Sequence, residues 1–470
     1  MFKNIFTNSF GILLSRITGF IRDLLQASIL GANIYTDMFF VAFKMPNLFR
    51  RIFGEGAFTQ SFIPTFAKST HKSIFAFVIL KKFSLALVGL TIFMYIFSEQ
   101  FTKLLAWGFS DEVIAKTAPL VVINFHYLIF IFGVTFLSSL LQYKNHFATT
   151  ALSTVLLNLS IIGALLLAKG LPSKQIVYYL SFAVVLGGAL QLFVHIIAIK
   201  KLKLDRLLII GYKRVKRAQN PIKDDIDRFK KGFLASLLGG STAQISAFID
   251  GVLASFLAAG SISYLYYANR LFQFPLAIFA TATSVAIFPR VAKYLNQNKE
   301  KEAKVMLKKS FWLLLYILSF SAIIGIVFSK EIIWLLLQRG AFTSTDTMIT
   351  SNILTMYLVG LIPFGLAKIF SLWLYSNHKQ AIAAKISAIA LIGDIILAIV
   401  LVNFLKVEGL ALAGSLGGVI LFVLTIKEFG VKNFFDILSF KHIMIYILFI
   451  SLMIASMISL KGYLSAYIQL

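Results

Sequence analysis

Charged side chains inside otherwise apolar segments are the feature of this sequence with the clearest chemical potential. They include Arg270 and, near the start of the chain, Arg16, Arg22 and Asp23, with the polar Ser15 beside Arg16. A charge at the centre of a bilayer costs at least ~2.5–3.5 kcal/mol, so such residues usually face a cavity or a partner. We expect one of the first two arginines to pair with Asp23. Because guanidinium groups bind phosphate oxygens bidentately, the remaining arginines predict a site for an anion such as a phosphorylated lipid headgroup.

A second polar group lies in the next apolar segment. Asp37 is near its start, and Lys44, Asn47 and Arg51 follow at helical spacing on one face. Arg50 and Arg51 have an alternative explanation, because arginines near the end of a span can extend to the lipid headgroups. The sequence therefore predicts a polar, cationic helix face here.

Two acids, Asp250 and Asp394, also fall within apolar segments. Carboxylates at that depth are typical of a site for a coupling proton or monovalent cation. The alternative is that they pack between helices and accept hydrogen bonds from hydroxyls such as Ser246 or Ser387. The chain has no cysteine, and its histidines lack metal-ligand spacing, so we expect no cofactor beyond Na+ or H+ as a coupling ion and the membrane potential.

Membrane-spanning helices are the elements that must position these residues. The 470-residue chain is 59% hydrophobic and 14% charged, whereas a soluble domain is about 45–50% apolar and about 25% charged. Its mean hydropathy is +0.86. A spanning helix needs roughly 20 apolar residues. About thirteen such spans are predicted, at 8–28, 34–53, 75–97, 117–140, 149–168, 176–199, 232–258, 263–289, 310–328, 350–373, 381–404, 409–427 and 441–460.

The basic residues behind the formal charge of +26 concentrate in the connections between these spans. Lysines and arginines concentrate at 200–231 and 293–309, both after even-numbered spans. The positive-inside rule then places the N-terminus and these connections in the cytoplasm. Topology accounts for the charge, so no nucleic-acid partner is needed.

The long basic connection divides the predicted fold into two lobes. We expect an N-lobe with spans one to six at 1–199, a cytoplasmic amphipathic linker at 200–231, a C-lobe with spans seven to twelve at 232–427, and a tail with span thirteen at 428–470. An internal repeat supports this division: Asp23, Leu30-Gly31 and Met45-Pro46 align, with a small gap, to Asp250, Ala259-Gly260 and Phe274-Pro275. The prediction is an all-α polytopic membrane protein of two six-helix lobes in parallel pseudo-repeat, a common build of transporters.

Two long motifs carry a resemblance to a known family. The runs SRITGFIRD at 15–23 and TDMFFVAFKMPNLFRRIFGEGAF at 36–58 closely resemble the signature of the MurJ (MviN) lipid II flippases. This family belongs to the multidrug/oligosaccharidyl-lipid/polysaccharide (MOP) exporter superfamily. The later segments SIS at 261–263, YYANRL at 266–271 and GAFT at 340–343 are also similar.

The resemblance implies transport of lipid II, a lipid-linked peptidoglycan precursor, from the inner to the outer leaflet of the bacterial cytoplasmic (inner) membrane by alternating access, for cell-wall synthesis. Lipid II, membrane lipids and the cell-wall machinery are the implied partners, and a monomer is the implied state. The implied cavity arginines are Arg16, Arg22, Arg50 and Arg270. The other implied substrate positions are Ser15, Asp23, Asp37, Lys44 and Asn47. A sodium site is implied at Asp250 and Asp394.

Three departures from the family pattern affect these implications. Ala390 and Gly414 stand where an amide and a hydroxyl would help to bind a cation, which weakens side-chain coordination of sodium. Asn269 and Gln273 replace acids around Arg270, so the cavity becomes more cationic. The residues after Leu460 are too few for a fourteenth span at 1.5 Å per residue, so the groove for the lipid tail should have one wall fewer.

Two other functions compete with this interpretation. One is a related MOP exporter of another polyprenyl-linked glycan or of a drug. The other is a membrane-embedded cell-wall transferase, which would need outward-facing acids spaced for catalysis or metal binding. The candidates Asp111, Glu112, Glu331 and Asp346 lack such spacing, and no Gly-rich phosphate-binding motif is present. We therefore expect a transporter rather than an enzyme.

Overall fold

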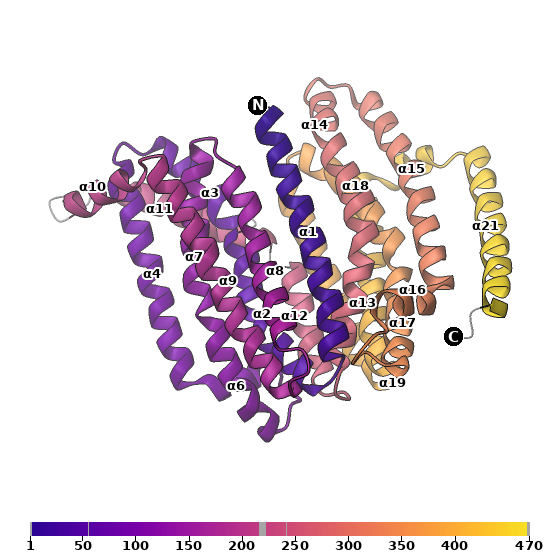
Figure 1. The fold of residues 1–470 in the computed structure, drawn as a ribbon. Coiled ribbons are helices and arrows are strands. Elements are labelled where there is room, and N and C mark those ends of the chain that lie inside the picture. Colours follow the sequence, from indigo (N-terminus) through magenta and orange to yellow (C-terminus); the bar gives the residue numbers. More distant parts are fainter. Residues whose placement is uncertain (1, 55, 216–221, 241, 468–470) are drawn as a thin grey trace. The chain divides into compact units, whose positions relative to one another are not determined.

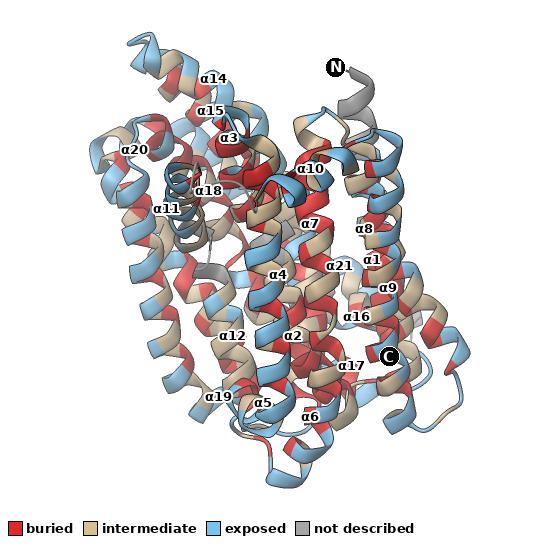
Figure 2. Cartoon of the chain, turned by 90° about the vertical axis from the view of Figure 1, so that its left-hand side faces the viewer, coloured by how far each residue is buried: buried red, intermediate tan, exposed pale blue. Residues whose placement is uncertain are grey.

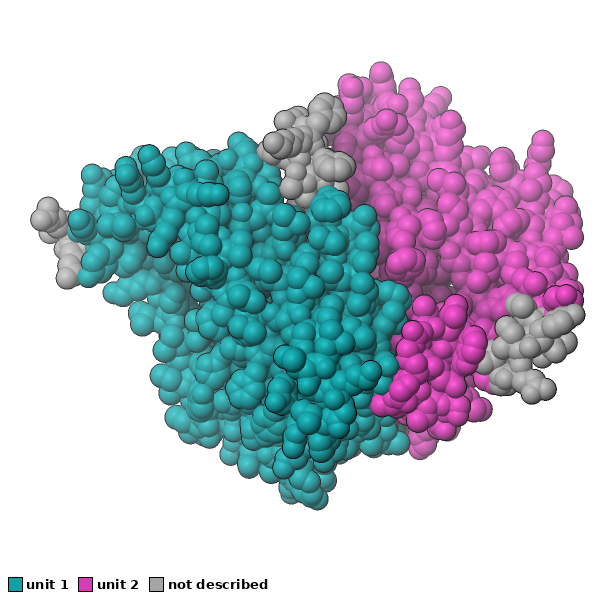
Figure 3. Space-filling model, viewed as in Figure 1, with its two compact units in different colours: residues 1–260 teal, residues 261–470 magenta. Residues whose placement is uncertain are grey.

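The computed structural model describes residues 2–54, 56–215, 222–240 and 242–467, and every regular element in these ranges is a helix (Figure 1). The chain divides into two compact units, residues 1–260 and 261–470, which are coloured separately in Figure 3. Unit 1 contains α1 (Phe2–Leu30), α2 (Ile34–Gly54), α3 (Ala57–Lys68), α4 (Lys72–Ile96), α5 (Ser98–Leu105), α6 (Asp111–Phe125), α7 (Tyr127–Tyr143), α8 (Ala148–Leu167), α9 (Ser173–Lys201), α10 (Asp205–Val215), α11 (Lys223–Gly240) and α12 (Thr242–Ala254).

Unit 2 begins directly after Gly260. Its elements are α13 (Ser261–Pro275), the π-helix η1 (Leu276–Thr281), α14 (Ala282–Asn296), α15 (Glu300–Val327), α16 (Ser329–Leu337), α17 (Ser344–Val359), α18 (Leu361–Ser376), α19 (Gln380–Phe429), α20 (Val431–Ile437) and α21 (Phe440–Tyr467). The all-helical class is as predicted. The lobe boundaries expected from the basic connection stay a prediction.

Each predicted span falls on a single helix or on two consecutive helices, except 263–289, which covers α13, η1 and the start of α14. Nine helical segments within the described ranges are long and apolar enough to cross a membrane, judged by length and composition. The charge-bearing helices α1 and α2 are not among these nine. One of the nine, α19, covers two predicted spans. The chain is a multi-pass membrane protein, and its span count of thirteen stays a prediction.

Many of these helices bury one side and expose the other (Figure 2). In unit 1, α1 packs on α8, α8 and α7 pack on α9, and α2 packs on α6 and α7. In unit 2, α13 packs on α17, while α18 and α17 both pack on α19. Side chains on the outer faces are largely apolar, including Leu85, Phe193 and Phe404. Apolar residues facing outward are expected when hydrocarbon is the solvent.

Both copies of the internal repeat contain a glycine with a left-handed backbone conformation just before a helix. Gly31 and Gly260 adopt φ of 70° and 94°, the left-handed region that only glycine enters at little cost. Each glycine precedes a helix that contains a proline fifteen residues further on, Pro46 in α2 and Pro275 in α13. Beyond Pro275, which cannot donate a backbone hydrogen bond, the helix widens into η1. The structure thus supports the alignment of the two copies.

Two other local predictions, a break between two spans and an amphipathic stretch, can be compared with the structure. The predicted break between spans eleven and twelve is a kink at Lys406, which has φ 50° and ψ −127° inside α19. The predicted amphipathic stretch in the basic linker is α10, which packs on α4. A Cβ at Gly211 would collide with the carbonyl of Ser73, so this glycine permits the close approach. Ile209 and Tyr212 of α10 stay exposed.

Candidate functional site

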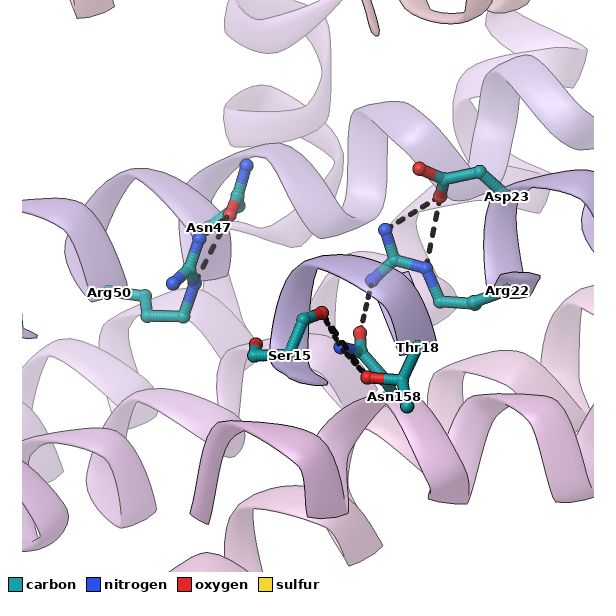
Figure 4. Close-up of polar contacts among 7 residues, drawn as sticks. All are labelled: Ser15, Thr18, Arg22, Asp23, Asn47, Arg50 and Asn158. Atoms are coloured by element: carbon teal, nitrogen blue, oxygen red, sulfur yellow. Dashed lines mark hydrogen bonds and ion pairs between the residues drawn. The ribbon is translucent and has the colours of Figure 1, made fainter. Parts of the chain in front are cut away.

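Arg22 is held in place by hydrogen bonds that it donates to neighbouring side chains (Figure 4). Its Nη2 lies 2.7 Å and its Nε 3.1 Å from Oδ1 of Asp23, so the predicted local ion pair is confirmed. Its Nη1 donates to Oδ1 of Asn158 at 3.1 Å. Arg22 is 7% exposed and Asp23 is 3% exposed. A buried guanidinium that is paired and hydrogen-bonded in this way has a fixed direction.

Asn158 is a functional candidate that the sequence reasoning missed. Its Nδ2 donates to the carbonyl oxygen of Ser15 at 3.0 Å and to Oγ1 of Thr18 at 3.1 Å, which joins α8 to α1 (Figure 4). Its amide therefore bridges the backbone at Ser15 and the guanidinium of Arg22. A lone asparagine in the apolar run of α8 was the available signal, because intramembrane amides usually bond across helices.

Arg16 differs from Arg22 although it lies on the same helix. Its side chain is exposed, and Ser15 beside it is half-buried. Within the part of the chain that the structure describes, Arg16 makes no hydrogen bond or ion pair. Its guanidinium therefore remains available to a ligand.

Arg50 and Asn47 form a hydrogen-bonded pair within α2. Arg50 donates from Nη2 and Nε to Oδ1 of Asn47, at 3.0 Å and 3.3 Å (Figure 4). Both residues are half-buried. The side chain of Arg51, predicted on the same face as Lys44, lies outside the described residues. The amide of Asn47 thus orients Arg50 from one helical turn away.

Lys44 joins α2 to α12 within unit 1. Its ammonium donates to the carbonyl oxygen of Phe248 at 2.7 Å and lies 4.6 Å from the centre of the Phe248 ring. The carboxylate of Asp250 attracts the same ammonium. A Cβ at Gly251 would collide with the lysine Nζ, so glycine is needed for this approach. Lys44 and Asp250, predicted to serve cargo and coupling ion respectively, therefore interact.

Asp37 has a structural partner at the end of unit 1. Its Oδ2 accepts a hydrogen bond from the backbone amide of Gly260 at 2.7 Å, and Asp37 is 2% exposed. The start of α2 is set by Asn33, whose Oδ1 accepts from the amides of Tyr35 and Thr36. That cap fixes where Asp37 points. Asp37 therefore fastens the backbone turn that leads out of α12.

Unit 2 carries the remaining predicted residues. Arg270 and Asn269 are half-buried on α13, and Gln273 donates to Oδ1 of Asn269. Asp394 is 6% exposed on α19. An ideal Cβ built on Gly417 would lie 2.9 Å from the Cβ of Asp394 and 3.6 Å from the carbonyl oxygen of Ala390. Ala390 and Gly417 offer no side-chain oxygen, which agrees with the departure noted at Ala390; Gly414 instead faces Tyr357.

The acids considered for catalysis are engaged in local structure. Asp346 caps the start of α17 with Thr343 and accepts from the hydroxyl of Tyr264 at 2.6 Å. Lys461 lies 3.5 Å from Glu331, while Asp111 and Glu112 pair with nearby lysines. No group of three or more metal-ligating side chains gathers within the residues that the structure covers.

Comparison of the helix arrangement with solved structures shows the class of protein to which the chain belongs. The fold matches a multidrug resistance MATE family transporter of the MOP superfamily in its inward-facing conformation, with a TM-score of 0.69 at 13% identity, over 89% of this chain and 94% of that one. It also matches a structure described as "Lipid II flippase MurJ, inward closed conformation", with a TM-score of 0.79 at 27% identity, over 96% and 98% of the two chains. The chain has the MOP transporter fold.

The family follows from the sequence comparisons. The family model "Lipid II flippase MurJ" matches residues 26–468. A protein of Helicobacter pylori (strain ATCC 700392 / 26695), named "Probable lipid II flippase MurJ", is 46% identical over 91% of this chain and 94% of its own length. A protein of the same name from Buchnera aphidicola subsp. Baizongia pistaciae is 33% identical over 92% and 84%. This chain belongs to the MurJ family.

Proposed function

We propose that this chain moves lipid II from the inner to the outer leaflet by alternating access. The observation that carries the proposal is the set of arginines on membrane helices, of which Arg22 is fixed and Arg16 is available. A pyrophosphate group presents oxygens to more than one guanidinium at once. Membership of the MurJ family and its named relatives supports lipid II as the cargo rather than another glycan or a drug.

The predicted site residues take different roles in this proposal. Arg16, Arg50 and Arg270 would bind the pyrophosphate, while Arg22 adds fixed positive charge. Asp23 and Asn47 orient the arginines beside them, and Ser15 presents its backbone oxygen to Asn158. Lys44 and Asp37 would hold α12 and its following turn, and their bonds would change during alternating access.

A coupling ion is the second part of the proposal. Na+ or H+ would act at Asp250 and Asp394, with the membrane potential contributing about 2.3 kcal/mol per charge per 100 mV. Ala390 and Gly417, which lie beside Asp394, have no side-chain oxygen to offer such an ion. The electrostatic attraction between Asp250 and Lys44 links that coupling position to a cargo helix.

The cellular setting completes the proposal. The chain would act as a monomer in the bacterial inner membrane with its N-terminus in the cytoplasm, beside the cell-wall synthesis machinery. It would perform transport without catalysis, since the acids considered for a transferase are occupied in ion pairs and a helix cap.

Complementation of a flippase-depleted bacterium tests this function. We expect the wild-type chain to restore growth and outer-leaflet lipid II, and Arg270→Ala to abolish both at equal membrane abundance. Lys385→Ala, which removes a positive charge from α19 of unit 2, is the matched control and should behave as wild type. Absence of rescue by the well-expressed wild-type chain would indicate a different cargo, and rescue by Arg270→Ala would remove that residue from the site.

A further inference from the structure

A partly open groove of about 280 Å³ lies between α4 and α11. These two helices, labelled in Figure 1, carry none of the site residues described above. This volume is nearly twice the ~150 Å³ of a cavity that binds benzene. Its apolar lining includes Ile79, Phe83 and Ala86 of α4 and Ile226, Phe229 and Phe233 of α11. The groove therefore has room for part of a hydrocarbon chain.

The groove exists because α11 is supported mainly from one side. It packs extensively on α3, while its direct contact with α4 is sparse. Phe229 is buried and lies edge-on to Phe58 and Phe83, with centroids 5.5 Å and 6.0 Å away. Phe233 meets Phe83 at 5.7 Å. These rings fill the inner part of the space between the helices and leave the outer part open.

Two exposed lysines, Lys82 of α4 and Lys230 of α11, complete the lining. Neither makes an ion pair within the described residues. The nearby acid Asp225 lies 3.7 Å from Arg228 on its own helix. An apolar groove with cationic groups from both walls complements a molecule that has a hydrocarbon chain and a negative head.

Both lysines lie on the side where their predicted spans begin, which the positive-inside rule places in the cytoplasm. Lys82 is seven residues into the predicted span 75–97, ~10 Å from its start at 1.5 Å per residue, and its long side chain can extend toward the headgroups. Lys230 lies two residues before the seventh predicted span. Both ammonium groups can therefore approach the phosphates of the cytoplasmic leaflet.

We propose that this groove binds an anionic phospholipid, with an acyl chain on the phenyl rings and the phosphate between Lys82 and Lys230. The lipid bridges α4 and α11, two helices that have little direct contact. A peptide is a poorer occupant, because the side chains of the lining offer no acceptor for its backbone N–H groups. A choline headgroup is also poorer, because it brings a positive charge to two lysines.

Lipid binding by the purified full chain tests the proposal through native mass spectrometry at low salt. Phosphatidylglycerol should bind more tightly than phosphatidylcholine. Each lysine near an anionic surface contributes about fivefold to binding, so Lys82→Gln/Lys230→Gln should weaken phosphatidylglycerol binding roughly 30-fold. The matched control Lys81→Gln/Lys231→Gln removes the same charge outside the lining and should change binding less than threefold. Equal losses in both double variants would overturn the proposal.

A second variant tests the hydrocarbon part of the groove. Ala86→Phe, at an exposed lining position, fills the groove without removing charge and should weaken both lipids about tenfold. Millimolar inorganic phosphate should not displace phosphatidylglycerol. Unchanged binding in Ala86→Phe, or full displacement by phosphate, would show a surface anion site instead. A clear preference for lipid II over phosphatidylglycerol at these lysines would also contradict the proposal.

Discussion

Two arginines of α1 differ in almost every physical respect although they are six residues apart. Arg22 is 7% exposed and bonded to Asp23 and Asn158, whereas Arg16 is exposed and makes no such bond within the described residues. Asp23 neutralises the charge of Arg22 and fixes its plane. Among the described residues, no acid forms an ion pair with Arg16.

This difference indicates a division of labour within one helix. A guanidinium whose donors are already used binds a new anion only by exchanging partners, and a buried unpaired carboxylate is costly. Arg16 can bind an anion without that exchange. We therefore interpret Arg22 as the residue that fixes α1 against α8, and Arg16 as the residue that engages the cargo. The predictions below test this comparison on protein stability, from the largest expected loss to the smallest.

The largest loss is expected for Arg22→Ala, because it leaves the carboxylate of Asp23 buried without its cation. Breaking one side of a buried ion pair costs about 3–5 kcal/mol, although polar contacts in membrane proteins often measure less, near ~0.6 kcal/mol on average. Thermal unfolding of the purified protein in detergent should show a fall of several degrees, and transport should be lost.

The control for this prediction removes both charges. Arg22→Ala/Asp23→Ala leaves no unpaired charge, so it should recover at least half of the lost stability while transport stays absent. If Arg22→Ala unfolds at the wild-type temperature, the ion pair is not structural, and Arg22 would join Arg16 as a direct cargo residue.

An ion pair between neighbouring residues can be predicted from the sequence, whereas a contact between two helices that are far apart in the sequence cannot. The pair Arg22–Asp23 was predictable because neighbours on a helix stay close in any packing. Asn158 was missed, because its contact with Arg22 joins residues 136 positions apart and depends on α1 packing on α8. The same limit applies to Lys44 and Phe248, 204 positions apart.

The fold shows the same contrast between local and distant information. Apolar length predicted segments that all fall on helices, and the glycine and proline pattern predicted the repeat around Gly31 and Gly260. The break inside a predicted span at the start of α7, after His126, and the bend of α19 at Lys406 have no such signal for their position. They depend on packing rather than on hydropathy.

A smaller loss is expected for Asn158→Leu, which keeps the size of the side chain but removes its hydrogen bonds to α1. Hydrogen bonds to charged groups contribute about 1.5–3 kcal/mol in soluble proteins and less in membranes, and Arg22 keeps Asp23. We expect about 1 kcal/mol of destabilisation and slower lipid II transport. Leu159→Ala, at a half-exposed position on the same helix, is the control and should change transport little. Wild-type transport and stability in Asn158→Leu would argue against the bridge between α8 and α1.

The smallest effect on stability is expected for Arg16→Ala, and here transport and stability should separate. An exposed side chain without bonds usually changes stability by less than about 0.5 kcal/mol when it is removed. The unfolding temperature should therefore match wild type while complementation and outer-leaflet lipid II are lost. Arg16→Lys keeps the charge but not the bidentate geometry, so it should restore transport in part. A marked loss of stability in Arg16→Ala would show that both arginines hold α1 in place, and the proposed division of labour would fail.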